Sequence, residues 1–275
     1  MGSRSRSLVA VLALTLAFAG VSQAQRFFRE GSFAPKWAPD KMPDASVVLC
    51  RVAYRQVRSE QSGIGWMTDY PYAEINLTTR LSELTKTHVS REGGVQPNHY
   101  SVRLTDASLF NCPILMMSDA GTVGFGEDEI ANLRNYLLKG GFLWADDFWG
   151  TAAWEQFSTQ IARVLPPPDF VMEDIRLDDP VLHSQFEIAQ IPQITNIRFW
   201  RMTGGRETSE RGNDSAVVHL RAIRDQKGRI VVLASHNTDI ADSWEREGED
   251  PAFFLQFSPK GYALGINVLM HVMTH

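Results

Sequence analysis

The chain has 275 residues, of which 44% are hydrophobic, and its formal net charge at pH 7 is -5. This is enough apolar material for the core of one large domain or two small ones. Its basic residues are scattered, which excludes the basic stripe that a nucleic-acid partner would require.

The first 24 residues follow the three-part plan of a secretory signal peptide. Arg4 and Arg6 precede an apolar run over residues 8–21, and a small-x-small cleavage site ends at Ala24. The run is shorter than the ~20 residues that a membrane-spanning helix needs, although a retained anchor is the alternative. We expect export to the periplasm or the extracellular space, with no stable membrane insertion after signal removal.

The next segments predict a lead-in followed by the first strand and helix of an α/β domain. Residues 25–45, rich in proline and aromatic residues, indicate an extended lead-in packed on the domain. The β-rich stretch 46–54 predicts a central strand. A loop over 56–72 precedes leucines at helical spacing over 77–84, and a short strand is expected around 101–104.

The middle of the chain carries the clearest pattern. Residues 111–118 predict a buried strand, and residues 127–139 predict a helix with acids in its first turn and Gly140-Gly141 as its stop. A second strand over 141–146 ends on Asp146 and Asp147. An amphipathic helix over 154–164 follows, so this order favours a mostly parallel sheet.

The remainder predicts an insertion, a hairpin and a terminal helix. Residues 166–212 are irregular, residues 216–224 and 229–236 form a hairpin pattern, and residues 261–274 are a largely apolar helix. We therefore expect one α/β domain over 46–275. It has three layers, helices on both faces of the sheet and an added β-hairpin region.

Two cysteines, Cys50 and Cys112, are the only ones in the chain. An oxidising compartment would allow them to pair. Cys50 lies inside a predicted strand and Cys112 just before another, so pairing needs a specific register. Two buried free thiols is the interpretation we prefer, and a disulfide stays open. Their spacing is not that of a zinc site.

Several fragments carry a resemblance to known families. Residues 110–147 (FNCPILMMSDAG…EDEIANLRNYLLKGGFLWADD) resemble the core of class I glutamine-amidotransferase-like domains. Taken together, residues 66–85, 140–150 and 235–245 resemble a bacterial family of unknown function numbered 4159. This resemblance implies a flavodoxin-like three-layer fold, export and a role in the cell envelope, but it implies no known reaction.

The chain departs from true amidotransferases at the nucleophile. In those enzymes the elbow after this strand holds a cysteine, whereas this chain has Asp146 or Asp147 there. Without a thiolate the glutaminase reaction has no nucleophile, so we reject that activity.

Asp146 and Asp147 lie at the carboxyl end of a buried strand, where open α/β sheets place their ligands. They could bind Mg²⁺ or Ca²⁺, or act as a general base. Adjacent residues of a strand point to opposite faces, so at most one should face the crevice. The alternative is that one caps a turn while the other meets backbone N–H groups or an arginine.

A second group lies in the segment HNTDIADSWE, namely His236, Asn237, Asp239, Asp242 and Glu245. The amidotransferase-like fold would bring this segment to the same end of the sheet, so that His236 and an elbow aspartate face one crevice. Asp239 and Asp242 would then join Asp146 and Asp147 as metal ligands. The alternative is an acidic surface turn with one satisfied histidine.

A third group follows the first strand. Asp69, Tyr70, Asn76 and Arg80 could bind a ligand in the same crevice, since an arginine suits a carboxylate or a phosphate. Aromatic side chains there could stack on a sugar or a peptide, or could simply pack the loop. Trp149 fits the crevice wall.

Two functions therefore compete. The first is an exported, non-catalytic binding module for an envelope protein or glycan. The second is a metal-assisted or carboxylate-based hydrolase that uses Asp146 or Asp147 with His236. We expect no organic cofactor, and a divalent metal is possible. The chain has no G-x-S-x-G elbow, no P-loop and no H-E-x-x-H motif.

Overall fold

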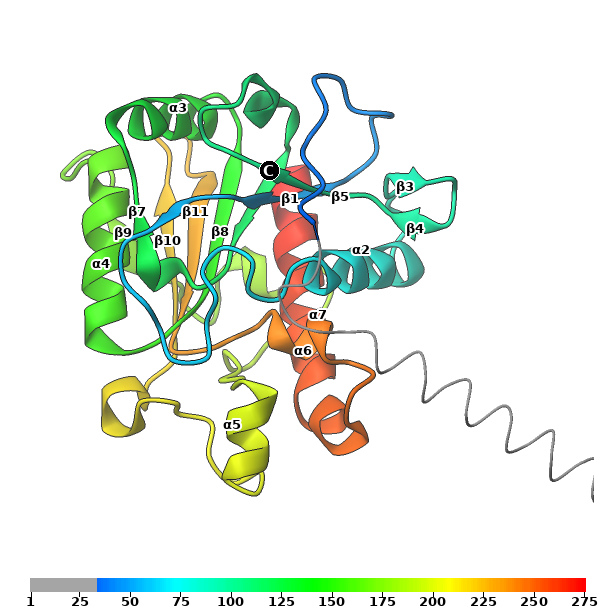
Figure 1. Ribbon diagram of the computed structural model, residues 1–275, viewed down its shortest axis with the longest axis vertical. Helices are drawn as coiled ribbons and strands as arrows, with labels where there is room; N and C mark the ends of the chain where they lie inside the picture. The colour runs from blue at the N-terminus through cyan, green and yellow to red at the C-terminus, as the bar shows by residue number, and fades with distance from the viewer. Residues whose placement is uncertain (1–33) are drawn as a thin grey trace, which may run out of the picture. The chain divides into compact units, whose positions relative to one another are not determined.

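A seven-stranded sheet forms the centre of the computed structural model, which describes residues 34–275 (Figure 1). Its strands, in spatial order, are β5 (His99–Val102), β1 (Leu49–Val52), β6 (Ile114–Met117), β8 (Phe142–Phe148), β11 (Ile230–His236), β10 (His219–Arg224) and β9 (Met172–Asp174). The first five run parallel to one another, and β10 pairs antiparallel with both of its neighbours, β11 and β9. The expected mostly parallel α/β sheet is thus confirmed. The predicted signal peptide and the start of the lead-in lie outside the described residues.

The five parallel strands follow the chain in the order 2-1-3-4-5. In such doubly wound sheets, ligands bind beyond the carboxyl ends of the strands where the order reverses. Here the reversal lies between β1 and β6, so the loops that follow these two strands are the first place to look for a site.

Helices and apolar side chains cover both faces of the sheet. One core contains residues of α3 (Glu127–Leu138) and α4 (Gly150–Val164). The other contains residues of α2 (Tyr72–Leu84) and α7 (Pro251–Thr274). The remaining elements are α5 (Ile197–Met202), α6 (Asp242–Glu245), the strand pairs β2 (Arg55–Gln56) with β7 (Val123–Gly124) and β3 (Arg91–Glu92) with β4 (Gln96–Pro97), and four short 3-10 helices: η1 (Ala107–Asn111), η2 (Ala120–Thr122), η3 (Pro180–Leu182) and η4 (Gly212–Ser215).

Helix α3 forms for the reasons that its sequence suggests. Its first turn is acidic, which suits the helix dipole, and Glu129 accepts a hydrogen bond from the Gly126 amide at 2.8 Å. Ile130, Leu133 and Leu137 are buried, as predicted. The elements that position the strand end of β8 can therefore be derived from local rules.

The two cysteines form a disulfide, so the preferred interpretation of free thiols was wrong. Cys50 lies in β1, and Cys112 lies just before β6, which is the neighbouring strand. Their Cα atoms are 5.9 Å apart, within the range that a disulfide spans. The sequence predicts a strand at Cys50 and another just after Cys112, but it does not show that these two strands are neighbours in the sheet.

Two other expectations need correction. Helix α7 begins at Pro251, about ten residues before the predicted start, and runs through Pro259. Its first turn is capped by Asp250, which accepts hydrogen bonds from two backbone amides. The hairpin is also no addition, because β11 pairs with β8 inside the main sheet. None of the helices within residues 34–275 has both the length and the apolar character for crossing a membrane.

The described part of the lead-in packs on the sheet edge. Trp37 bridges to Ser101 of β5, and the Ser101 amide donates to the carbonyl of Lys36 at 2.7 Å. From residue 34 onward, the lead-in therefore contacts the sheet of its own domain.

Candidate functional site: a buried carboxylate cluster

Five aspartates meet at the carboxyl ends of four parallel strands. The loop after β1 supplies Asp69, the end of β6 supplies Asp119, β8 supplies Asp146 and Asp147, and the loop after β11 supplies Asp239. All but Asp147 are almost completely buried, with exposed fractions of 1% or less. This many acids in one apolar surrounding is costly unless protons or cations balance them.

A β-bulge explains how both residues of the Asp146-Asp147 pair reach the cluster. Ala145 pairs with Ala234 and Phe148 with His236, so two residues of β8 oppose a single residue of β11. Bulges re-aim side chains and are frequent next to active sites. Of the two, Asp147 lines the opening of the cluster and Asp146 is fully buried, so the structure does not contradict the expectation that at most one faces the crevice.

Four residues at these strand ends have a positive φ, namely Asp69 (65°), Asp119 (50°), Asp147 (54°) and Asn237 (63°). This backbone region is unfavourable for most side chains, but aspartate and asparagine tolerate it better than others. Such conformations persist only where the surrounding structure holds them, and they gather at functional sites. Three of the four carry carboxylates of the cluster.

The carboxylates form two overlapping groups, each with the spacing of a metal site. Asp69, Asp147 and Asp239 have oxygens within 4.8 Å of one another, and we call them the Asp147 group. Asp69, Asp242 and Glu245 meet the same criterion, and we call them the Glu245 group. Ligands that lie 2.3–2.6 Å from a Ca²⁺ ion are at most about 5 Å apart, so both groups could surround one ion.

An arginine lies beside two acids of the Glu245 group. The Nε atom of Arg246 lies 2.6 Å from Glu245 Oε2 and 3.3 Å from Asp242 Oδ1, so the Glu245 group already contains a cation. Among residues 34–275, no basic side chain forms an ion pair with Asp147 or Asp239. Two of the three acids of the Asp147 group, Asp147 and Asp239, are thus without a basic ion-pair partner among the described residues.

Hydrogen bonds hold the Asp147 group in place from several directions. Asp69 Oδ2 accepts from the Ser118 hydroxyl at 3.0 Å, and Asp147 Oδ1 accepts from the Trp149 indole at 3.1 Å. Asp239 Oδ1 accepts from the Asp242 amide at 2.9 Å. The backbone N–H of Asp239 in turn donates to the carbonyl of Ile194 at 2.9 Å. These bonds orient each carboxylate without adding positive charge.

Two further acids present unused oxygens. Asp146 Oδ2 accepts from the Ala241 amide at 2.8 Å and Asp119 Oδ2 accepts from the Gly65 amide at 2.8 Å. Their Oδ1 atoms are buried and have no hydrogen-bond partner among the described residues. A buried oxygen without a partner is rare in native proteins and calls for a ligand, an ion or a proton.

Burial and mutual repulsion make the cluster hard to ionise. Burial raises the pKa of Asp119 and of Asp146 to about 7 each, and nearby carboxylates, Asp69 among them, add to the effect. Burial, followed by the charges of neighbouring aspartates, raises the pKa of Asp147 and of Asp239 well above the ordinary value. A bound divalent cation would favour the ionised carboxylates and so lower these pKa values again.

The cluster opens to the surface through a small cavity. It has a volume of about 10 Å³ and is lined by Asp119 and Asp147, with Glu60, Glu210, Trp149 and Asn196 among its other walls. About this much space is needed for one water molecule. The opening therefore admits a water or an ion, and it is too small for a substrate.

Several predicted binding residues have structural roles instead. Tyr70 accepts a hydrogen bond from the Lys36 amide, and Asn76 donates to the Trp244 carbonyl. Arg80 pairs with Glu83 and Glu247, and Asn237 accepts from the Gly150 amide at 2.7 Å. The structure brings Asp69, Trp149 and Asp239 into the site but not these four.

His236 does not join the aspartates. Its Nε2 atom lies 3.1 Å from the Gly150 carbonyl, and its Nδ1 atom lies 3.2 Å from Arg221. The ring packs between His219, Phe148 and Trp154. Both ring nitrogens are thus engaged elsewhere, and the expectation that His236 and an elbow aspartate share one crevice is corrected.

Three acids of the site were absent from the sequence-based candidates. Asp119, Glu60 and Glu210 line the opening. Asp119 follows a predicted strand directly, so the rule that singled out Asp146 could have found it too. Glu60 and Glu210 lie in irregular segments, where no local pattern marks them.

A comparison with protein families now adds to this geometry. The model of the family described as "Domain of unknown function (DUF4159)" matches residues 49–273. The chain belongs to the DUF4159 family. This confirms the family resemblance of the sequence fragments, and the match includes every strand end that supplies the cluster. No curated protein matches the DUF4159 chain.

Proposed function

We propose that this DUF4159 domain is an exported binding module whose buried carboxylate cluster holds one hard divalent cation, such as Ca²⁺, Mg²⁺ or Mn²⁺. Its doubly wound sheet would be an amidotransferase-like fold without the nucleophile, acting in the bacterial cell envelope. Carboxylate oxygens are the ligands that these ions prefer.

One observation carries the proposal: Asp147 and Asp239 belong to a group with the spacing of a metal site, and neither forms an ion pair with a basic side chain among the described residues. The neighbouring Glu245 group has the same spacing but contains Arg246. Arg246 balances Asp242 and Glu245, so we infer that an exchangeable cation balances Asp147 and Asp239. The unpartnered Oδ1 atoms of Asp119 and Asp146 support this inference.

The geometry supports binding better than hydrolysis. A metal-dependent hydrolase needs an open position on the metal for water and substrate. The opening at Asp147 has a volume of only about 10 Å³, and His236 is bonded to Gly150 and Arg221 rather than to an aspartate. The cation would then hold the strand ends together and stabilise the fold.

Two features support export. The N-terminal sequence has the plan of a signal peptide. The Cys50–Cys112 disulfide suits an oxidising compartment outside the cytosol.

The test is thermal unfolding of the purified protein, first treated with a chelator and then titrated with Ca²⁺, Mg²⁺ or Mn²⁺. A ligand at a hundredfold excess over its Kd adds about 2.7 kcal/mol of stability. For a domain of this size we expect a Tm increase of roughly 5–10 °C. Asp147→Asn and Asp239→Asn should abolish the increase.

Asp178→Asn provides the matched control, because Asp178 is exposed and pairs only with Arg176. It should keep the full increase. Without cations, Asp147→Asn should unfold at or above the wild-type temperature, because one of several mutually repelling charges is gone. The proposal fails if no divalent ion changes Tm, or if the three variants respond alike.

A further inference from the structure

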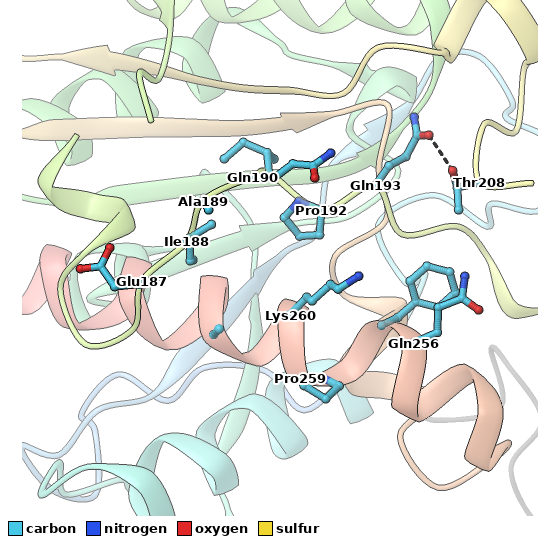
Figure 2. Close-up of a pocket in the computed structure, with 13 residues that line it drawn as sticks. Glu187, Ile188, Ala189, Gln190, Pro192, Gln193, Thr208, Gln256, Pro259 and Lys260 are labelled. Carbon is cyan, nitrogen blue, oxygen red and sulfur yellow. Dashed lines mark hydrogen bonds between the residues drawn. The ribbon is translucent and has the colours of Figure 1, made fainter. Parts of the chain in front are cut away.

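A second cavity lies away from the carboxylate cluster, between residues 187–193 and helix α7 (Figure 2). Its volume is about 600 Å³, which lies within the range of pockets that bind small molecules and peptides. Ile191, Pro192, Phe257 and Pro259 give it apolar walls. None of the acids of the Asp147 group lines it.

One wall of this cavity is a backbone without regular secondary structure. Ile194 donates its N–H to the Thr238 hydroxyl at 2.9 Å, and the Pro192 carbonyl accepts from the same hydroxyl at 3.0 Å. Ile191 and Gln193 alternate with these residues, and their backbone N–H and C=O groups have no partner among residues 34–275. Backbone groups in this state are met by water or by a ligand.

The cavity also contains an unpaired positive charge. Lys260 extends from α7 beneath the 187–193 segment, as Figure 2 shows, and forms no ion pair with a described residue. The acid at the far end of the cavity, Glu187, instead lies 2.7 Å from His183. The Gln256 oxygen accepts from the Trp200 indole at 3.1 Å, and its amide nitrogen has no hydrogen-bond partner among the described residues.

These groups are complementary to a polypeptide. A ligand that displaces water from alternating free N–H and C=O groups must itself alternate donors and acceptors, and an extended peptide does so along its whole length. An ammonium group beside them favours a carboxylate. A sugar would offer hydroxyls at no such regular spacing.

We propose that this cavity binds an extended segment of a partner protein that pairs with the backbone of residues 191–193 and places an acidic group on Lys260. The partner is thus recognised by main-chain hydrogen bonds and by one charge. The proposal does not depend on the cation site.

The probe is a capped six-residue peptide of alternating valine and threonine with a glutamate at its last position. Titrated into the isotopically labelled protein, it should shift the amide resonances of Ile191 and Gln193. Lys260→Gln should weaken binding about tenfold, the size expected for one charge-assisted contact of ~1.4 kcal/mol. Lys227→Gln, at an exposed lysine in a hairpin turn, should leave it unchanged.

Two matched peptides sharpen the test. Replacing the glutamate by glutamine should weaken binding to the wild type but make no difference to Lys260→Gln. Methylating alternate backbone nitrogens should abolish binding. The proposal is overturned if the methylated peptide binds as well as its parent, if the shifts lie elsewhere, or if only a tetramer of N-acetylglucosamine binds in the cavity.

Discussion

Arg246 Nε lies 3.3 Å from Asp242 Oδ1, so a cation already lies against one of the two groups of acids that have the spacing of a metal site. Arg246 directly follows α6, the short helix that contains both of its partners, Asp242 and Glu245. On the other side of Asp69, no such residue follows Asp147 or Asp239. One helical turn thus decides that Asp242 and Glu245 have a cationic partner.

Replacing this arginine should create a second cation site. In Arg246→Gln the Glu245 group loses its positive charge, and leaving buried acids unpaired costs about 3–5 kcal/mol. Divalent cations should recover part of this loss, and the stoichiometry measured by equilibrium dialysis should rise from one ion to two. Arg201→Gln, at an exposed ion pair, should cost less than about 1 kcal/mol and keep one ion.

Cation affinity should increase with pH. Burial raises the pKa of Asp147 and Asp239 well above the ordinary value, so protons compete with the cation at a higher pH than they would at exposed aspartates. Titration calorimetry in two buffers of different ionisation enthalpy should show proton release on binding, with a weaker Kd at pH 5.5 than at pH 8. An affinity that does not change with pH would contradict a ligand set made of buried carboxylates.

Without cations, stability should change with pH in the opposite sense. The pKa of Asp146 is about 7 in the folded chain against an ordinary 3.8, so the folded state binds more protons between these values. The contribution of Asp146 to the free energy of unfolding is therefore present at low pH and is lost as the pH rises through about 7. Urea unfolding of the chelated protein should show this loss, and Asp146→Asn should reduce it.

His236 should act in the other direction. Burial lowers its pKa from 6.5 to about 4, with the Arg221 charge adding to the effect and the Gly150 carbonyl and Asp214 opposing it. The neutral ring is favoured in the folded state, so its contribution is complete above pH 6.5 and is lost as the pH falls towards 4. The stability difference between wild type and His236→Gln should shrink over that interval, as measured by urea unfolding.

Removing the disulfide should weaken the fold without affecting the cation site. The bond spans 62 positions, and the chain-entropy model gives about 4 kcal/mol for a loop of that length. The double variant Cys50→Ala with Cys112→Ala should unfold at lower urea, and reduced wild type should behave similarly. If reduction left the urea midpoint unchanged, the covalent link would not contribute to stability.

Local patterns predicted the parts of the fold that local chemistry determines. Helix α3 begins at its acidic turn and ends before Gly140-Gly141, because caps and dipoles act within a few residues. The importance of Asp146 and Asp147 followed from a strand end, which is also a local feature. The start of α7 was missed because Pro259 resembles a stop, whereas the helix continues through it.

The rest depends on contacts between distant residues. The bulge in β8 exists only because of its pairing with β11, about ninety positions later, and no property of Asp146 or Asp147 announces it. Likewise, the direction of the His236 ring is set by Phe148 and Trp154, which lie on other elements. The sequence pattern correctly predicts that His236 lies at a strand end, but it does not predict the direction of its ring.

The hydrogen bond from the Asp239 amide to the Ile194 carbonyl has a thermodynamic consequence. It joins a ligand of the proposed cation to the backbone that borders the second cavity. If an occupant of that cavity shifts Ile194, it changes how well Asp239 is placed for the cation. By linkage, the cation must then change the affinity of that occupant by the same factor. The affinity of the domain for a protein partner would then depend on the concentration of the cation.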